Sequence, residues 1–158
     1  MKKLILSILL VSAFAFQLQA SILGAPKWQF NHTVDGIVKI DVAVTGGSAL
    51  ITKNTNGSVM TMLVFDNNNV CQSVALFNSN ANAVQGFDAF ESTIAGNLTW
   101  QAISGNGITG RVATVDGVYT YCVDGIQYNK GIPYAYRIYA SPAGITLGQK
   151  LVAMIGQF

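Results

Sequence analysis

Short runs of alternating apolar and polar residues, separated by turns rich in Asn, Asp and Gly, are the feature that most limits how this chain can fold. In residues 37–44, IVKIDVAV, Val38, Ile40, Val42 and Val44 alternate with Lys39 and Asp41. Successive side chains of a β-strand point to opposite faces, so this pattern predicts a half-buried strand. The Asn-Gly pair at 56–57 predicts a hairpin, because both residues tolerate positive φ. The polar run at 66–69, DNNN, predicts another turn.

Such segments recur every 8 to 12 residues or so, which is typical of an antiparallel β domain. About nine strands are predicted, at residues 37–44, 49–52, 58–65, 70–77, 97–103, 108–115, 118–123, 134–139 and 145–158. The expected fold class is all-β or mainly β, as a sandwich or a curved half-barrel sheet. Asp124-Gly125 and Asn129-Lys130-Gly131 are expected in a loop, and a short helix is expected only within residues 87–93.

The first twenty residues have the layout of a secretory signal peptide. Lys2 and Lys3 form a basic start, Leu4 to Phe16 are apolar, and the small residue Ala20 suits cleavage. The apolar run is shorter than the roughly 20 residues of a transmembrane helix, although a retained anchor is the alternative. We therefore expect a signal peptide at 1–20 and one domain at 21–158, secreted or, in a bacterium, periplasmic.

Charge argues against a nucleic-acid partner. The chain has nine Lys and Arg and seven Asp and Glu, and Lys2 and Lys3 leave with the signal, so the mature domain is close to neutral. A neutral domain has no electrostatic footprint for nucleic acid or an anionic membrane. Charged residues make up 10% of the chain, against about 25% in typical soluble domains, which suits an extracellular protein and also a small outer-membrane β-barrel.

Two cysteines, Cys71 and Cys122, are present, and an oxidising compartment favours a disulfide between them. That bond would close a loop of about 50 residues and stabilise the fold by roughly 4 kcal/mol. A free thiol is the alternative.

No residue set predicts catalysis, a cofactor or a metal. His32 is the only histidine, which leaves a catalytic triad or a zinc site without its usual groups. Glu91 and Asp88 would share one face of a short helix and are the only candidates for a carboxylate pair, but surface roles are more common for such pairs. Sequons at Asn31, Asn56 and Asn97 would carry glycans in a eukaryote.

Residues 58–65 are apolar on both faces, which predicts a central strand or one wall of a ligand pocket. Methionine lines adaptable apolar sites. Met60, Met62, Val64 and Trp100 are the candidate ligand-binding residues, with core packing as the alternative. The sequence thus suggests a secreted, non-enzymatic binding protein for an apolar, lipid-like small molecule. The alternatives are an extracellular structural or adhesive domain that exposes Tyr119, Tyr121, Tyr134 and Tyr136 to protein or glycan partners, or the small outer-membrane barrel.

One family comparison rests on a hairpin that ends in a cysteine, MLVFDNNNVC at 62–71, followed by Trp100 and by GVYTYC at 117–122. This order resembles secreted ependymin-related proteins, whose curved antiparallel sheet is similar to that of the bacterial lipoprotein carrier LolA. The chain is shorter than those proteins and lacks their further cysteines. The resemblance implies a cavity for a lipid or another apolar ligand and no enzymatic activity.

Overall fold

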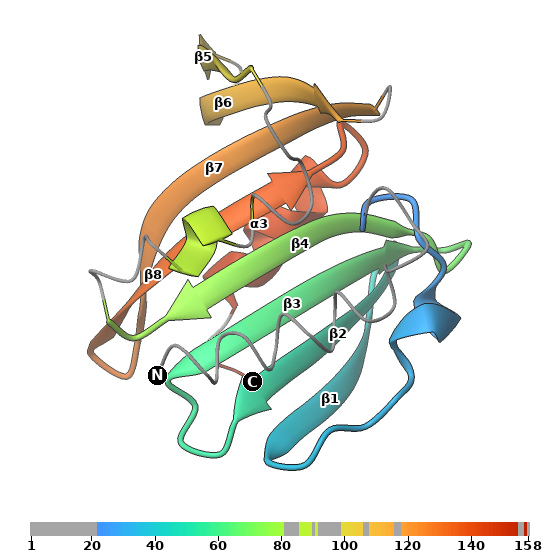
Figure 1. Ribbon diagram of the computed structural model, residues 1–158, viewed down its shortest axis with the longest axis vertical. Coiled ribbons are helices and arrows are strands. Elements are labelled where there is room, and N and C mark those ends of the chain that lie inside the picture. The colour runs from blue at the N-terminus through green and yellow to red at the C-terminus, as the bar shows by residue number, and fades with distance from the viewer. Residues whose placement is uncertain are drawn as a thin grey trace.

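The computed structural model of the protein describes residues 22–80, 86–89, 91, 99–105, 108–115, 118–154 and 157. They form one open antiparallel sheet with the strand order β1-β2-β3-β4-β8-β7-β6-β5 (Figure 1). The elements are η1 (Lys27–Phe30), β1 (Ile37–Val44), β2 (Gly47–Asn54), β3 (Val59–Asp66), β4 (Cys71–Asn78), β5 (Gln101–Gly105), β6 (Ile108–Val115), β7 (Val118–Asn129), β8 (Ile132–Ala140) and α3 (Ile145–Ala153). The predicted mainly β, antiparallel class is confirmed, and a single open sheet forms instead of a sandwich.

Turn residues join neighbouring strands where the sequence predicted them. The Asn-Gly turn at 56–57 connects β2 to β3, and the Asn run at 67–69 connects β3 to β4. Between β7 and β8 the loop is only Lys130 and Gly131, with φ values of 50° and 79°. Two consecutive positive φ angles produce the turn that matches the twist of adjacent strands, so this hairpin is tight.

Strand β3 is buried on both faces, as predicted for a central strand. All residues from Val59 to Phe65 are buried. One face of the sheet carries Leu63 and Val74 and packs against residues 22–30; we call it the N-terminal face. The other carries Met62 and Ala75 and packs against α3; we call it the helix face. Figure 1 shows α3 behind the sheet.

The first described residues lie along the start of β4. The backbone N–H of Gly24 donates to the Cys71 carbonyl at 2.8 Å, and the Cys71 N–H donates to the Ala25 carbonyl at 2.8 Å. Ile22 and Leu23 are buried in the N-terminal face. The segment just after the expected cleavage site therefore belongs to the core of the domain.

The last predicted strand, 145–158, is wrong, and this is why the sheet has eight strands instead of about nine. Residues Ile145–Ala153 form the helix α3. Its buried residues, Ile145, Gly148, Leu151 and Val152, are spaced three and four apart, which is the period of one helix face.

A short helix was expected within residues 87–93. Residues 86–89 and 91 have helical backbone, and residues 92–93 lie outside the described part.

The loop predicted at Asp124-Gly125 is also wrong, because both residues lie inside β7. Gly125 pairs with Tyr136 of β8. A Cβ atom on Gly125 would lie 2.2 Å from the Tyr136 hydroxyl oxygen, so the aromatic ring covers the space that a side chain would need. Glycine within a strand often marks such a close approach.

A β-bulge joins the sheet to α3. Phe65 pairs with Cys71 and Val64 with Ser73, so Gln72 is the extra residue of β4. The Gln72 carbonyl accepts the Ser141 N–H at 2.9 Å. A Cβ atom on Gly144, the residue before α3, would lie 2.2 Å from that same carbonyl oxygen. The bulge and the helix start are therefore in backbone contact.

We expect Gly144→Ala to destabilise the protein, because the added methyl group meets backbone atoms that cannot rotate away. The loss in the free energy of unfolding should be about 1–3 kcal/mol, measured by urea denaturation. Ala143→Ser, at the exposed neighbouring position, should change it by less than about 0.5 kcal/mol. Equal stability of the two variants would contradict this contact.

Candidate functional site

The four predicted ligand-binding residues do not form one site. Met60, Met62 and Val64 are buried in the helix face. Trp100 packs on the N-terminal face, with its ring centre 6.3 Å from that of Tyr139. The three residues of β3 therefore pack in the core, which was the alternative prediction for them.

The predicted disulfide between Cys71 and Cys122 is not formed, since both residues are buried free thiols. Tyr139 of β8 pairs with Val74 of β4 on one side and with Cys122 of β7 on the other. Strand spacing and the rise per residue put the Cα atoms of the two cysteines roughly 14 Å apart. A disulfide needs a Cα–Cα distance below about 7 Å, so an intervening strand prevents the bond.

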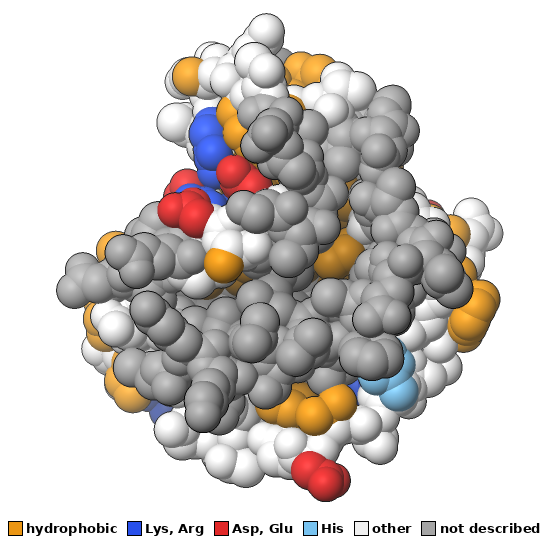
Figure 2. Space-filling view, viewed as in Figure 1, with side chains coloured by type: hydrophobic (Ala, Val, Ile, Leu, Met, Phe, Trp, Pro, Cys, Tyr) orange, Lys and Arg blue, Asp and Glu red, His pale blue; other side chains and the backbone are white. Residues whose placement is uncertain are grey.

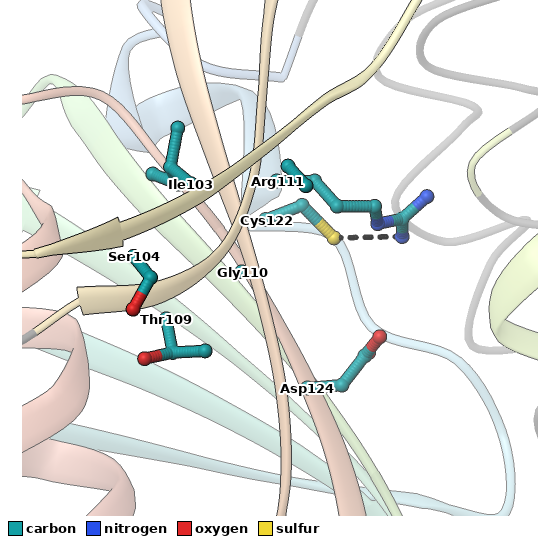
Figure 3. Close-up of a pocket in the computed structure, with 8 residues that line it drawn as sticks. Ile103, Ser104, Thr109, Gly110, Arg111, Cys122 and Asp124 are labelled. Atoms are coloured by element: carbon teal, nitrogen blue, oxygen red, sulfur yellow. Dashed lines mark hydrogen bonds between the residues drawn. The ribbon is translucent and has the colours of Figure 1, made fainter.

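A hollow of about 480 Å³ lies beside Cys122 on the N-terminal face. It is lined by Ala102, Ile103, Ser104, Thr109, Gly110, Arg111, Cys122 and Asp124, which come from β5, β6 and β7 (Figure 3). Figure 3 shows the Ser104 and Thr109 hydroxyl groups on one side, and the Arg111 guanidinium and Asp124 on the other. We call this site the β5–β7 hollow.

The hollow exists because β6 separates from β7 before β6 ends, and its residues 108–110 are paired with β5 but not with β7. Pairing between them runs from Val115 with Val118 to Arg111 with Cys122. Beyond Cys122, β7 continues to Asn129 and pairs with β8 alone among the described strands. The free part of β7 and the end of the β5–β6 hairpin therefore border an open space.

Arg111 is held in place at the hollow by three neighbours. Its Nη2 donates to Glu91 Oε1 at 3.2 Å and to the Cys122 sulfur at 3.0 Å. Its guanidinium carbon lies 4.9 Å from the centre of the Trp100 ring, a cation–π contact. These contacts restrict the guanidinium to one orientation.

Arg137 lies next to this group and is almost fully buried, with 5% of its surface exposed. Its Nε donates to Asp124 Oδ1 at 2.6 Å, and its Nη1 donates to Asp88 Oδ1 at 2.8 Å. Glu91 Oε1 lies 3.6 Å from the same Nη1 and accepts the Tyr139 hydroxyl at 2.9 Å. Figure 2 shows acidic and basic side chains gathered at the upper left of this face.

The predicted pair Asp88 and Glu91 does share one face of its helical turn, as expected. Both carboxylates form ion pairs with arginine, so they fasten the helical residues 86–89 and 91 to the sheet. Sequence reasoning missed Arg137, the partner that explains them. Its signal was a lone charge in the otherwise uncharged run YAYRIYA of β8.

Burial and ion pairing shift the pKa values of this group. Burial alone would lower the pKa of Arg137, but its hydrogen bonds to Asp124 and Asp88 raise it above the ordinary value. Burial raises the pKa of Cys122 to about 11, against the opposing effect of the Arg111 charge, and raises that of Cys71 to about 12. Both arginines therefore stay charged, and both thiols stay protonated at neutral pH.

The remaining residues singled out from the sequence lie on the surface or outside the described residues. Asn31, His32 and Asn56 are exposed. Asn97 lies outside the described residues. Within the described part, no group of three or more His, Cys, Asp or Glu side chains is arranged to hold a metal ion. The same residues contain no helix with the length and hydropathy needed to cross a membrane.

No protein-family model, curated protein or solved structure matches this chain. The resemblance to ependymin-related proteins therefore stays a prediction that rests on the residues quoted for it.

We expect both thiols to resist alkylation in the native protein. At pH 8, a pKa of about 11 leaves roughly a thousandth of Cys122 as thiolate, and burial hinders the reagent further. Iodoacetamide should label neither cysteine in the folded protein within minutes and both after denaturation, as measured by intact mass. A native mass two hydrogens below that of the dithiol would show a disulfide and contradict the structure.

We expect Arg137→Met to lower the free energy of unfolding by about 2 kcal/mol or more, because three carboxylates lose their shared cation. The effect stays below that of a fully buried pair, since Asp88 and Asp124 are more than half exposed and can be rehydrated. Lys130→Met, at an exposed turn, is the matched control. A double-mutant cycle with Asp88→Ala should show a coupling energy, and additive effects would contradict the ion pair.

Proposed function

We propose that this chain is a secreted, non-enzymatic binding protein that holds a small ligand in the β5–β7 hollow. The observation that carries the proposal is an arginine held in a fixed orientation at the rim of a surface hollow. Ligand sites are concave, measure about 300–1,000 Å³, and contain a few fixed polar groups. The volume of about 480 Å³ falls in that range.

The lining combines apolar surface, to which Ala102 and Ile103 contribute, with hydrogen-bonding groups, so it favours a ligand that carries both apolar and polar groups over a purely apolar one. Arg111, Asp124, Ser104 and Thr109 all carry hydrogen-bonding groups at the hollow. The methionines expected to line an apolar cavity are packed in the helix face instead. The signal-peptide layout and the low charge of the chain support secretion.

An adhesive role is the second candidate, and exposed apolar residues at the end of the β7–β8 hairpin favour it. Ile126 and Tyr128 share one face of the hairpin and are 55% and 64% exposed, while Ile132 lies on the other face and is 49% exposed. Contiguous apolar surface often marks a protein contact, and Ile126 and Tyr128 are neighbours on one face. The tyrosines named from the sequence support it less, because Tyr134 is buried while Tyr119 is exposed.

Filling the hollow tests the first candidate. Ser104→Trp places a large ring in the hollow, whereas Gln101→Trp places one on the opposite face of the same strand, at an exposed position. Ligand retained by the native protein, detected by native mass spectrometry after secretion, should be lost from Ser104→Trp and kept by Gln101→Trp. Retention by both variants would assign the ligand elsewhere, and loss only from Tyr128→Ser would favour the hairpin patch.

A further inference from the structure

We infer that the β5–β7 hollow recognises a hydroxylated carboxylic acid, such as an acidic monosaccharide, with Arg111 as its anchor. This inference rests on the proposed function and names the class of ligand. It follows from the hydrogen-bonding groups that the hollow presents and from the balance of charge around them.

Arg111 has donors to spare for a ligand. A guanidinium group carries five N–H donors. Within the described part of the chain, the hydrogen bonds of Arg111 all leave from Nη2, toward Glu91 and Cys122, so the donors on Nε and Nη1 are unused. The side chain is 31% exposed. Because stacking on Trp100 already fixes its orientation, binding a carboxylate costs little side-chain entropy.

Asp124 supplies an acceptor on the same side of the hollow (Figure 3). Each of its oxygens accepts one hydrogen bond from Arg137, at 2.6 and 3.4 Å, and a carboxylate can accept about four. Its side chain is 53% exposed. A ligand hydroxyl group near the ligand carboxylate can therefore donate to Asp124.

The opposite rim fits the rest of such a ligand. Ser104 and Thr109 pair across β5 and β6 and are both exposed, and their hydroxyl groups can donate and accept. Ala102, which pairs with Arg111 across β5 and β6, adds an apolar surface for the C–H groups of a sugar ring. The lining thus offers a cation, an acceptor, two hydroxyl groups and an apolar contact.

Charge disfavours a dianion such as phosphate. Arg111 and Arg137 carry two positive charges, while Asp88, Glu91 and Asp124 carry three negative ones, so the group has a net charge of −1. A single carboxylate can approach the unused side of Arg111, but a second negative charge would meet Asp124. One carboxylate with neutral hydroxyl groups is the chemistry that matches.

Titration of the secreted, full mature chain with D-glucuronate tests the inference, with D-glucuronamide as the uncharged analogue and inorganic phosphate as the dianion. Amide chemical shifts in NMR give the affinity and the site. We expect glucuronate to bind at least about tenfold more tightly than the other two, since a charge-assisted hydrogen bond contributes that much. Shifts should centre on residues 102–104, 109–111 and 122–124.

Arg111→Gln should weaken glucuronate binding at least about tenfold and remove the preference over glucuronamide, whereas Lys130→Gln should change neither. Because Arg111 also contacts Glu91, Thr109→Val serves as a second variant that leaves that ion pair intact and should weaken binding several-fold. Equal binding of glucuronate and glucuronamide, an unchanged affinity in Arg111→Gln, or no shifts with glucuronate would overturn the inference. If Ser104→Trp still loses the retained native ligand in that case, the proposed function stands and only the proposed class of ligand is overturned.

Discussion

The central strands of this sheet are apolar on both faces, and the rest of the fold depends on covering them. Every residue of β3 from Val59 to Phe65 is buried, and so is most of β4. A single sheet leaves one face in water unless another layer covers it. Here α3 covers the helix face, while residues 22–30 and Phe87 cover the N-terminal face. Both covers come from outside the sheet and must be fastened to it.

Arg137 brings a positive charge into this buried layer, and the carboxylates that neutralise it hold the covering segment against the sheet. A buried cation is costly unless carboxylates surround it. Asp124 comes from the neighbouring strand, but Asp88 and Glu91 come from the helical turn of residues 86–89 and 91. Glu91 then reaches Arg111, which stacks on Trp100. The same ion pairs that hold the turn against β8 therefore also orient the arginine at the hollow.

Local patterns in the sequence predicted the strands well, because strand alternation and turn chemistry act over a few residues. The strand at 37–44 and the turns at 56–57 and 67–69 are examples. Two features needed contacts between distant residues. Gly125 has the local pattern of a turn, and only its contact with Tyr136 explains why it lies within a strand. The two cysteines suggest a disulfide, and only the position of β8 between them explains why none forms. The segment 145–153 lacks strand alternation and has helical spacing instead, so a stricter test of period would have identified α3.

The candidate site was hidden from the sequence for the same reason. No motif marks the β5–β7 hollow, since its residues come from three strands and none is unusual by itself. The hollow follows from where β6 separates from β7: β6 begins at Ile108, but its pairing with β7 covers only Arg111–Val115 and ends at Cys122, while β7 continues to Asn129. When one strand separates from its neighbour before either of them ends, part of the neighbour is left without a partner on that side. In this protein that uncovered part begins beside two arginines already fixed by ion pairs, and for that reason an irregularity of the sheet has the properties of a binding site.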